Sequence, residues 1–305
     1  MSVFVSQRAV PMYFDKEAWV ILDPIEQSIR NKIEKYGTPL KDWDVNIYRG
    51  ILTGCNEAFI IDGAKRAELI AADPKSDEII RPILRGKDIK RYGYDFDDKW
   101  LINIECGFTD SNRGNMKPEE FLKSTYPAIY QHFIDVANRP TKGKGLVDRD
   151  DKGDYWWELR SCAYMNDFAK QKIMYSEIVR SPRFFLDNEG KFYPEATSFI
   201  MVGNHLEYLV MALHSKILTY AFKTFYAGGG LGDDGYRYKK AFLEKLPIYV
   251  PTDEDSVFKN WLESNDDTKI ENYLQKAYKL TDDELAFIFR ANDFLRIKST
   301  SSSVK

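Results

Sequence analysis

Apolar and polar positions divide the chain into a short N-terminal helix, a central region rich in strands and a helical C-terminal end. Asp23-Pro24-Ile25-Glu26 has the pattern of a helix start, with an N-cap, a Pro at the first helical position and a capping-box carboxylate. Gly37 follows as the end signal. The sequence therefore predicts a helix over residues 24–36.

Alternating apolar and polar positions predict strands after Pro39. Residues 45–51 alternate like a half-buried strand, and residues 58–61 form the expected partner across a turn at Thr53-Gly54-Cys55-Asn56. Further strands are predicted at residues 100–104, 172–179, 183–186, 191–193 and 198–202. Residues 187–190, with the sequence Asp-Asn-Glu-Gly, predict a hairpin turn between 183–186 and 191–193.

The C-terminal part has helical periodicity. An apolar stripe predicts one helix over residues 204–221, with Asn204 as its cap and Glu207 closing the capping box. A glycine-rich loop at 228–235 follows, and the chain becomes acidic and helical beyond Pro251. Residues 267–280 predict one helix, and Thr281-Asp282-Asp283-Glu284 caps another. Residues 299–305 are expected to fray.

Composition excludes several classes of protein. The 305 residues include 44 Lys or Arg and 47 Asp or Glu, a formal charge of −3, and 44% are hydrophobic. That is enough apolar material for a core, which excludes a disordered chain. Near-neutrality argues against a histone-like polyanion binder. Residues 251–305 carry 8 basic and 11 acidic groups, which leaves residues 1–250 balanced at 36 against 36.

Targeting signals and cysteines are consistent with a cytoplasmic protein. Cys55, Cys106 and Cys162 are far apart and form no Cys-x-x-Cys pair, so neither a disulfide framework nor a zinc knuckle is expected. The first ten residues lack the features of a signal peptide. No apolar run approaches the roughly 18 residues that a membrane span requires. We therefore expect no membrane partner.

Candidate metal and nucleotide sites are weak. The histidines, His132, His205 and His214, form no metal-ligand motif. Asp97-Asp98-Lys99 before a strand is the one arguable nuclease-type triplet, so a stand-alone magnesium-dependent nuclease using Asp97 and Lys99 is an alternative function. The loop at 228–235 follows a helix, which is the wrong place for a phosphate-binding loop. It is either part of a nucleic-acid surface or a plain connection.

Basic segments are more informative. Residues 81–91 hold five cations and a single acid, Asp88, with Ile83, Leu84 and Ile89 as apolar anchors. Such a segment suits phosphate contact, although any single basic patch is more often a solvated face. A second zone runs from Arg139 to Lys144, and Tyr155-Trp156-Trp157-Glu158-Leu159-Arg160 follows it with aromatic residues beside an Arg.

Several of these segments together resemble a known family. Residues 48–61, which contain Gly50-Ile51-Leu52-Thr53-Gly54, resemble the opening of the TaqI-like C-terminal specificity domain. That domain is the target-recognition part of adenine-N6 DNA methyltransferases and type IIG restriction–modification enzymes, and it is similar to type I specificity subunits. The later matches, in order, are residues 80–92, 157–160, 208–217, 236–248 and 278–284. His214-Ser215-Lys216 stands where the family usually has Asn-Ser-Lys.

The resemblance implies an α/β (mixed α+β) fold with a mixed sheet, followed by a C-terminal helical segment. It also implies three parts: an N-terminal helical linker to a catalytic part at 1–42, a DNA target-recognition domain at 43–250 and a helical tail at 251–305. Neither the glycine-rich cofactor motif nor the Asn-Pro-Pro-Tyr tetrapeptide of such methyltransferases is present. We therefore expect a recognition module that is not itself an enzyme and binds no cofactor.

The expected partners are double-stranded DNA and an adenine-N6 methyltransferase catalytic domain or subunit, which would hold S-adenosylmethionine and magnesium. Arg85, Lys87, Lys90 and Arg91 are the predicted phosphate contacts, with the turn at Thr53 and Asn56 beside them. The remaining candidates for DNA contact are Arg139, Lys142, Trp157, Arg160 and Lys239. A protein-interaction scaffold that uses the acidic tail is a third possibility.

Overall fold

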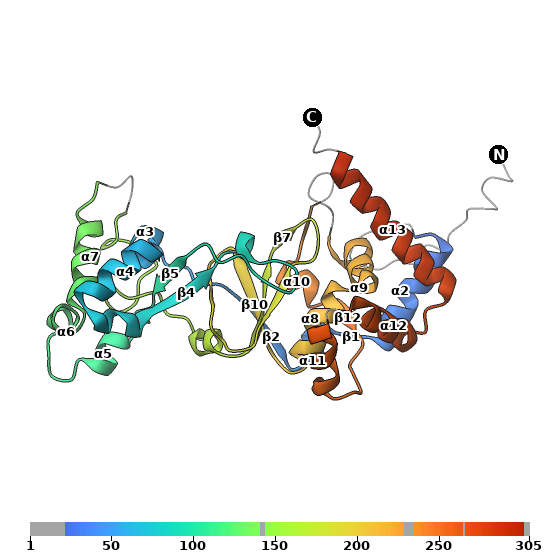
Figure 1. Ribbon diagram of the computed structural model, residues 1–305, viewed down its shortest axis with the longest axis horizontal. Helices are drawn as coiled ribbons and strands as arrows, with labels where there is room; N and C mark the ends of the chain where they lie inside the picture. The colour runs from blue at the N-terminus through green and yellow to red at the C-terminus, as the bar shows by residue number, and fades with distance from the viewer. Residues whose placement is uncertain (1–21, 141–143, 229–234, 265, 302–305) are drawn as a thin grey trace. The chain divides into compact units, whose positions relative to one another are not determined.

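The chain forms two compact units, each built from segments that are distant in the sequence. The computed structural model describes residues 22–140, 144–228, 235–264 and 266–301, with side chains as far as Asn292 (Figure 1). The helical unit comprises Met1–Asn46, Ile178–Pro182 and Gly203–Lys305, and the sheet unit comprises Ile47–Glu177 and Arg183–Val202.

This division differs from the predicted one. The N-terminal helix and the C-terminal tail, predicted as a linker at 1–42 and a tail at 251–305, belong to one unit together with residues 43–46, 178–182 and 203–250 of the predicted 43–250 domain. The chain passes between the units more than once, so no cut into consecutive segments reproduces them. The predicted mixed α+β class is confirmed, because both helices and strands build the fold.

The helical unit consists mainly of helices around one apolar core. α12 packs against α2, α8 and α9, while α13 packs against α9 and α11 against α8. Fully buried side chains such as Ile29, Leu209 and Ile270 fill the space between them. Its helices are α2 (Pro24–Tyr36), η1 (Leu40–Asp42), α8 (Leu206–His214), α9 (Lys216–Ala221), η5 (Phe222–Tyr226), α10 (Lys240–Leu243), α11 (Asp255–Ser264), α12 (Asp267–Tyr278) and α13 (Asp282–Ser301).

Two short antiparallel ribbons complete the helical unit. β1 (Thr38–Pro39) pairs with β12 (Pro247–Ile248). β7 (Ile178–Val179) pairs with β11 (Tyr236–Arg237), placing Val179 opposite Tyr236 and Ile178 opposite Arg237. The second ribbon therefore brings residues 178–182 next to residues 235–245.

Two of the three predicted capping boxes in this unit are confirmed, those at Asp23 and at Thr281. The Asp23 carboxylate accepts the backbone N–H groups of Ile25 and Glu26, and Glu26 in turn accepts the N–H of Asp23 at 3.1 Å. At the start of α13, Glu284 accepts the N–H of Thr281 at 2.8 Å, and the Thr281 hydroxyl accepts the N–H of Glu284. These local sequence patterns alone determine where the two helices begin.

The predicted single helix over 204–221 is wrong in two respects. His205, with φ of 57°, occupies the N-cap of α8 in place of Asn204, and it makes no side-chain capping bond. Ser215 interrupts the helix and caps α9 by accepting the N–H of Leu218 at 3.1 Å. Since Ser hydroxyls compete for backbone donors, a Ser inside an apolar stripe ends one helix and begins the next.

The sheet unit contains two four-stranded sheets and a group of small helices (Figure 1). One sheet has the order β2-β10-β6-β8, and the other has the order β3-β5-β4-β9. The strands are β2 (Val45–Arg49), β3 (Ile60–Asp62), β4 (Ile80–Leu84), β5 (Lys99–Ile102), β6 (Lys172–Ser176), β8 (Phe184–Asp187), β9 (Tyr193–Pro194) and β10 (Ser198–Gly203).

Helices of the sheet unit gather at the β3-β5-β4-β9 sheet. α4 packs against β3, β5 and α7, and α7 packs against α3 and α6. The helices are α3 (Asn56–Phe59), α4 (Gly63–Ala72), η2 (Pro74–Ile79), η3 (Gly86–Asp88), α5 (Phe108–Asn112), α6 (Pro118–Thr125), α7 (Pro127–Ala137) and η4 (Met165–Ala169). In the part of the chain that the structure describes, no helix combines the length and apolarity needed to cross a membrane.

The two predicted hairpins are wrong. Residues 56–59 form α3, and β3 pairs with β5 in the other sheet, so β3 is not the partner of β2. The turn after β8 does not connect a hairpin either, because β8 pairs with β6 whereas β9 runs parallel to β4. In both places the turn signal is local, whereas the choice of partner strand depends on contacts far along the chain.

A buried ion pair fixes the register of β6 against β8. Lys172 lies opposite Asp187, and its ammonium donates to the Asp187 carboxylate at 2.7 Å. Both side chains are buried, and burial lowers the pKa of Lys172. The same carboxylate accepts the N–H groups of Lys191 and Phe192, so the pair also holds the turn that follows β8.

Candidate nucleic-acid interface

The basic run, residues 81–91, begins in β4 and continues through η3. Its predicted apolar anchors are confirmed, because Ile83, Leu84 and Ile89 are buried to 1% exposure or less. The cations are less available than the sequence suggests. Arg85 binds Asp88 through Nε at 2.9 Å and also contacts Asp97, and these carboxylates raise the pKa of Arg85.

Acidic residues downstream neutralise further members of the basic run. The Lys87 ammonium lies 3.8 Å from the Asp97 carboxylate, and the Lys90 ammonium lies 3.1 Å from Asp95. Arg91 is exposed, with its guanidinium 4.8 Å from the centre of the Tyr92 ring. Arg85, Lys87 and Lys90, all predicted phosphate contacts, are therefore partnered by carboxylates. Arg85 is half-buried in its ion pairs, and its contact with phosphate stays a prediction.

The turn after β2 serves mainly to shape the backbone. Thr53 is 2% exposed, and its hydroxyl donates to the Asn56 side-chain oxygen at 2.6 Å and accepts the N–H of Cys55 at 3.2 Å. Gly54 has a φ of +68°, which favours glycine. The Thr53 side chain is therefore not available to DNA, and a contact through the backbone amides of this turn stays a prediction. Asn56 is exposed at the start of α3 and stays a prediction.

A buried arginine that the sequence did not single out organises the segment that follows α7. Arg149 is 3% exposed, and its guanidinium has no carboxylate partner in the described residues. It donates to the backbone carbonyls of Leu146, Asp151, Trp156, Glu158 and Thr53. Its guanidinium also lies 4.8 Å from the centre of the Phe59 ring. Burial lowers the pKa of Arg149 to about 10, still far above neutral pH.

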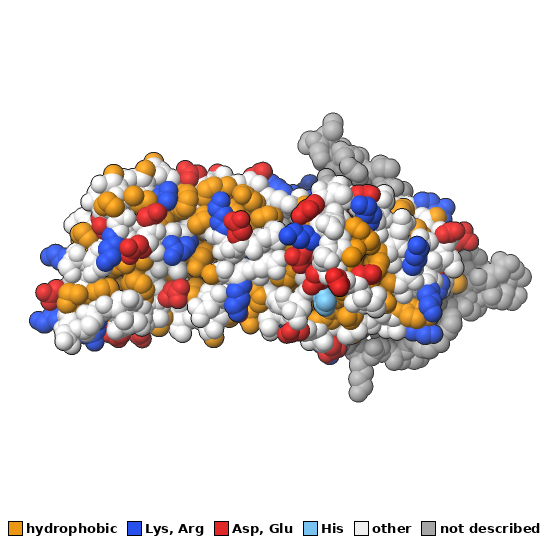
Figure 2. All heavy atoms as spheres, turned by 60° about the horizontal axis from the view of Figure 1, so that its bottom comes forward, with side chains coloured by type: hydrophobic (Ala, Val, Ile, Leu, Met, Phe, Trp, Pro, Cys, Tyr) orange, Lys and Arg blue, Asp and Glu red, His pale blue; other side chains and the backbone are white. Residues whose placement is uncertain are grey.

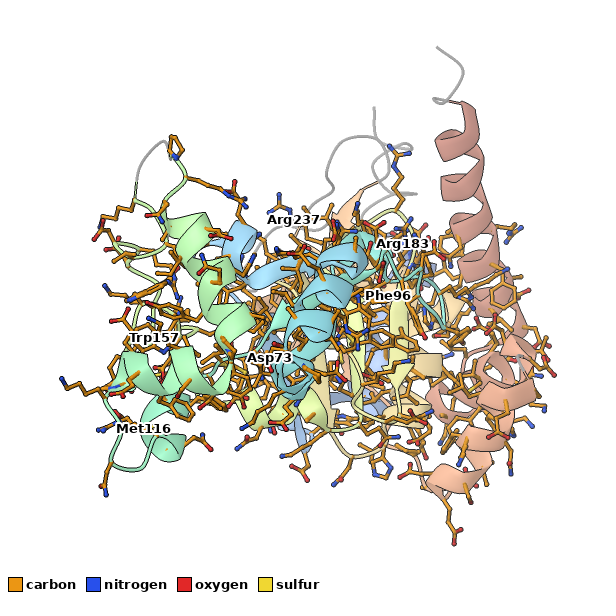
Figure 3. The ribbon with its side chains drawn as sticks, turned by 60° about the vertical axis from the view of Figure 1, so that its left-hand side comes forward. Asp73, Phe96, Met116, Trp157, Arg183 and Arg237 are labelled. Carbon is orange, nitrogen blue, oxygen red and sulfur yellow. The ribbon has the colours of Figure 1, made fainter. Side chains whose placement is uncertain are left out.

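The Trp-Glu-Leu-Arg motif at 157–160 is mostly interior. Trp157 is 3% exposed, and its indole N–H donates to the Thr109 hydroxyl at 2.9 Å. Figure 3 shows Trp157 within the body of side chains, whereas Met116 lies at the outer edge. The prediction that Trp157 reads bases is therefore wrong. Arg160 is exposed and pairs with Asp151 at 3.1 Å.

Glu158 is a structural acceptor. Its buried carboxylate accepts the backbone N–H groups of Gly107, Thr109, Asp154 and Tyr155. Cys106, Asp154 and Glu158 are the one group in the described residues whose ligand atoms lie close enough to hold a metal ion. Four amide donors already surround the Glu158 carboxylate, and they would be left without an acceptor if a cation displaced them. The donor set therefore does not fit a metal centre.

The nuclease alternative is not favoured. The Asp97 carboxylate is held by Arg85 and Lys87, and Arg85 lowers the pKa of Asp97. Asp98 accepts the indole N–H of Trp100 at 2.8 Å. These carboxylates are engaged with cations and a donor rather than converging on one point, as a metal-dependent nuclease requires.

The basic ribbon is the segment pair that β7 and β11 join, residues 178–182 with residues 235–245. It carries five cations and one acid, Glu244, which lies 3.6 Å from Lys240. No ion pair of Arg180, Arg237 or Lys239 with a carboxylate is found among the described residues. The Nε of Arg237, labelled in Figure 3, is buried without a hydrogen-bond acceptor there. The cations are Arg180, Arg237, Lys239, Lys240 and Lys245.

The remaining predicted contacts have mixed outcomes. Lys239 is exposed, with its ammonium 5.6 Å from the centre of the Phe242 ring. Arg139 is exposed just after α7. Lys142 and most of the glycine-rich loop lie outside the described residues. On the face shown in Figure 2, basic and acidic side chains are interspersed, so local pairing decides which cations are available.

Known proteins resemble this chain in sequence and in fold. The family model of the TaqI-like C-terminal specificity domain matches residues 81–248, more than half of the chain. The chain is 25% identical over 215 residues to the Type II methyltransferase M.MjaIV of Methanocaldococcus jannaschii, an alignment that covers 68% of this chain and 65% of that protein.

Two solved structures share the fold. The type IIL restriction-modification enzyme MmeI in complex with DNA matches 85% of this chain with a TM-score of 0.55 and 10% identity. The type IIG restriction endonuclease BpuSI matches 79% with a TM-score of 0.50 and 14% identity. The chain spans 36% and 27% of those two chains. By its family match, the chain belongs to the TaqI-like C-terminal specificity domains, the target-recognition domains of restriction–modification enzymes.

Proposed function

We propose that this chain recognises a specific sequence in double-stranded DNA on behalf of a methyltransferase catalytic part. The basic ribbon is the observation that carries the proposal. Its residues include five cations and a single acid, and no ion pair of the exposed Arg180 and Lys239 is found among the described residues. Phosphate oxygens are suitable acceptors for such cations, and neutralising phosphates releases counterions.

The fold supports the same proposal. MmeI, whose fold this chain shares, was solved in complex with DNA. Family membership limits what the basic ribbon contacts, since a target-recognition domain acts on duplex DNA rather than on a free nucleotide. The ribbon would supply sequence-independent affinity, and base contacts elsewhere would supply selectivity.

Catalysis is proposed to lie outside this chain, in the rest of a longer polypeptide or in a partner subunit. The chain lacks the Asn-Pro-Pro-Tyr tetrapeptide that contacts the target adenine in adenine-N6 methyltransferases. In this proposal S-adenosylmethionine, and magnesium where the parent enzyme also cleaves, bind to that catalytic part and not to this chain.

Fluorescence anisotropy with labelled random-sequence duplexes tests the proposal. With about four phosphate contacts, affinity should fall by roughly 100-fold between about 50 and 200 mM salt. Selection of bound duplexes should then enrich one sequence. No binding at low salt, either by the chain alone or by the chain with the methyltransferase part, would overturn the proposal.

A further inference from the structure

An irregular segment of the sheet unit is ordered without regular secondary structure. Between Lys144 and Tyr164, all within the described residues, no helix or strand forms, and a single isolated bridge joins Lys152 to Leu159. Irregular loops longer than about 12–15 residues are uncommon inside compact domains, and those that are ordered usually carry function.

Two buried charged side chains hold this segment in place. The Arg149 guanidinium donates to four backbone carbonyls within the segment and to that of Thr53. The Glu158 carboxylate accepts the N–H groups of Asp154 and Tyr155 within it and two more from the start of α5. One side chain satisfies the acceptors and the other satisfies the donors.

Burying Arg149 is costly because no carboxylate of the described residues forms an ion pair with it. A guanidinium taken out of water is stabilised here by carbonyl dipoles, by the Phe59 ring and by the weaker attraction of the Asp151 charge. An apolar side chain of similar length would fill the same space without that cost. However, it would leave the carbonyls of the segment without donors, and the segment would lose its fixed shape.

The surface that this segment presents is unlike the basic ribbon. Residues 144–160 contain four basic and five acidic residues, so the segment does not attract phosphates as a whole. Donors and acceptors of both signs, fixed on a rigid backbone, suit the edges of base pairs, where Asp accepts from cytosine and Arg or Lys donates to guanine. The exposed members are Lys144, Val147, Asp148, Asp150, Lys152, Asp154 and Arg160.

We propose that residues 144–160 form the element that reads base edges, and that Arg149 is the positioning residue that gives this element its shape. The inference rests on the proposed function and deepens it. Affinity comes from the basic ribbon in the helical unit, whereas selectivity comes from a different element in the sheet unit. Arg149 itself touches no DNA.

Selectivity is the measurement that separates positioning from general stability. We would select the preferred duplex with the wild-type chain, then compare its Kd with that of a scrambled duplex for the Arg149→Met and Arg149→Lys variants. The ratio of the two Kd values should fall by about tenfold or more in both variants, because several base contacts lose their geometry together. Binding to the scrambled duplex should stay within about threefold of wild type.

Lys172→Met is the matched control. It also removes a buried cation from the sheet unit, but Lys172 pairs with Asp187 between β6 and β8, and among the described residues no hydrogen bond or ion pair joins it to residues 144–160. It should lower thermal stability and keep the wild-type Kd ratio. Equal loss of selectivity in the Lys172 and Arg149 variants would overturn the inference, as would an unchanged ratio in folded Arg149 variants.

A surface variant keeps the test valid if the Arg149 variants do not fold. Asp150→Ala with Arg160→Ala removes one exposed acceptor and one exposed donor from the segment and leaves Arg149 in place. Its selected sequence should differ from that of the wild type at one or more positions, and an identical sequence would count against the inference. Failure of wild-type chain to bind any duplex would instead refute the proposed function.

Discussion

The basic run and the basic ribbon contain equal numbers of cations and of acids, but they differ in how many of their cations are paired with carboxylates. Each contains five cations and one acid. In the basic run, Asp95 and Asp97, which lie just outside it, join Asp88 and neutralise Arg85, Lys87 and Lys90. In the basic ribbon, Lys240 pairs with Glu244, and no ion pair of Arg180, Arg237 or Lys239 with a carboxylate is found among the described residues. Whether a cation is available to bind DNA therefore depends on which carboxylates the fold places next to it, and not on how many cations its segment contains.

The largest effect that this comparison predicts is on stability. Arg85→Met would leave Asp88, whose side chain is 5% exposed, without its charge partner in the sheet unit. Removing one member of a largely buried ion pair should lower the free energy of unfolding by roughly 2–4 kcal/mol, measured by urea denaturation. Lys87→Met at a 68% exposed neighbour should change it by less than about 0.5 kcal/mol.

Arg85→Met and Lys87→Met also distinguish a cation that stabilises the fold from a cation that contacts phosphate. If Arg85 were a phosphate clamp, Arg85→Met would weaken DNA binding and leave stability unchanged. That result would support Arg85 as a phosphate contact. The basic run and the basic ribbon would then no longer differ in the availability of their cations.

How far the sequence predicts this fold depends on the range of the interaction. The capping boxes at Asp23 and Thr281 were predicted correctly because all their partners lie within one helical turn. The strand partner of β3 was not predicted correctly, because β5 is distant in the chain. The burial of Trp157 was not predicted either, because its partner Thr109 is also distant. An aromatic residue beside an Arg has the same local pattern whether it faces a nucleic acid or the core.

The candidate site illustrates the same limit. Lys239 stood out in the sequence, whereas Arg180 did not, because only the pairing of β7 with β11 brings residues 178–182 to residues 235–245. Arg149 gave no signal either. Its neighbours in the sequence are acidic, which suggests a solvated ion pair, and only the fold reveals that its guanidinium points into backbone carbonyls.

The next effect concerns DNA affinity and compares matched pairs of cations. Arg180→Ala with Lys239→Ala removes two exposed ribbon cations and should weaken non-specific binding by about tenfold or more at low salt. It should also reduce the salt slope by about 2. Lys87→Ala with Lys90→Ala removes two cations from the basic run, and affinity should change by less than about threefold because each already has a carboxylate partner.

Equal losses in the two double variants would refute the comparison. They would mean that phosphates displace Asp95 and Asp97 from Lys90 and Lys87, so that the basic run and the basic ribbon act alike. A larger loss in the Lys87 and Lys90 double variant would favour the phosphate contacts predicted from the sequence over those inferred from the fold.

The smallest effect comes from unmasking the basic run. Asp97→Asn removes the carboxylate that faces both Arg85 and Lys87, so non-specific affinity for DNA should rise by about twofold. Because the Arg85 guanidinium lowers the pKa of Asp97 below its usual value near 3.8, the carboxylate stays ionised at every pH from 7 down to 5. Stability from a carboxyl group with a lowered pKa is present above its unfolded-state pKa and is lost only as the pH falls through the folded-state value. The ratio of variant to wild-type affinity should therefore stay constant over that range. A ratio that approaches one by pH 5 would mean that Asp97 is already protonated at that pH. The Arg85 guanidinium, which forms an ion pair with Asp97, opposes such protonation. The result would therefore contradict the ion pairs that distinguish the basic run from the basic ribbon.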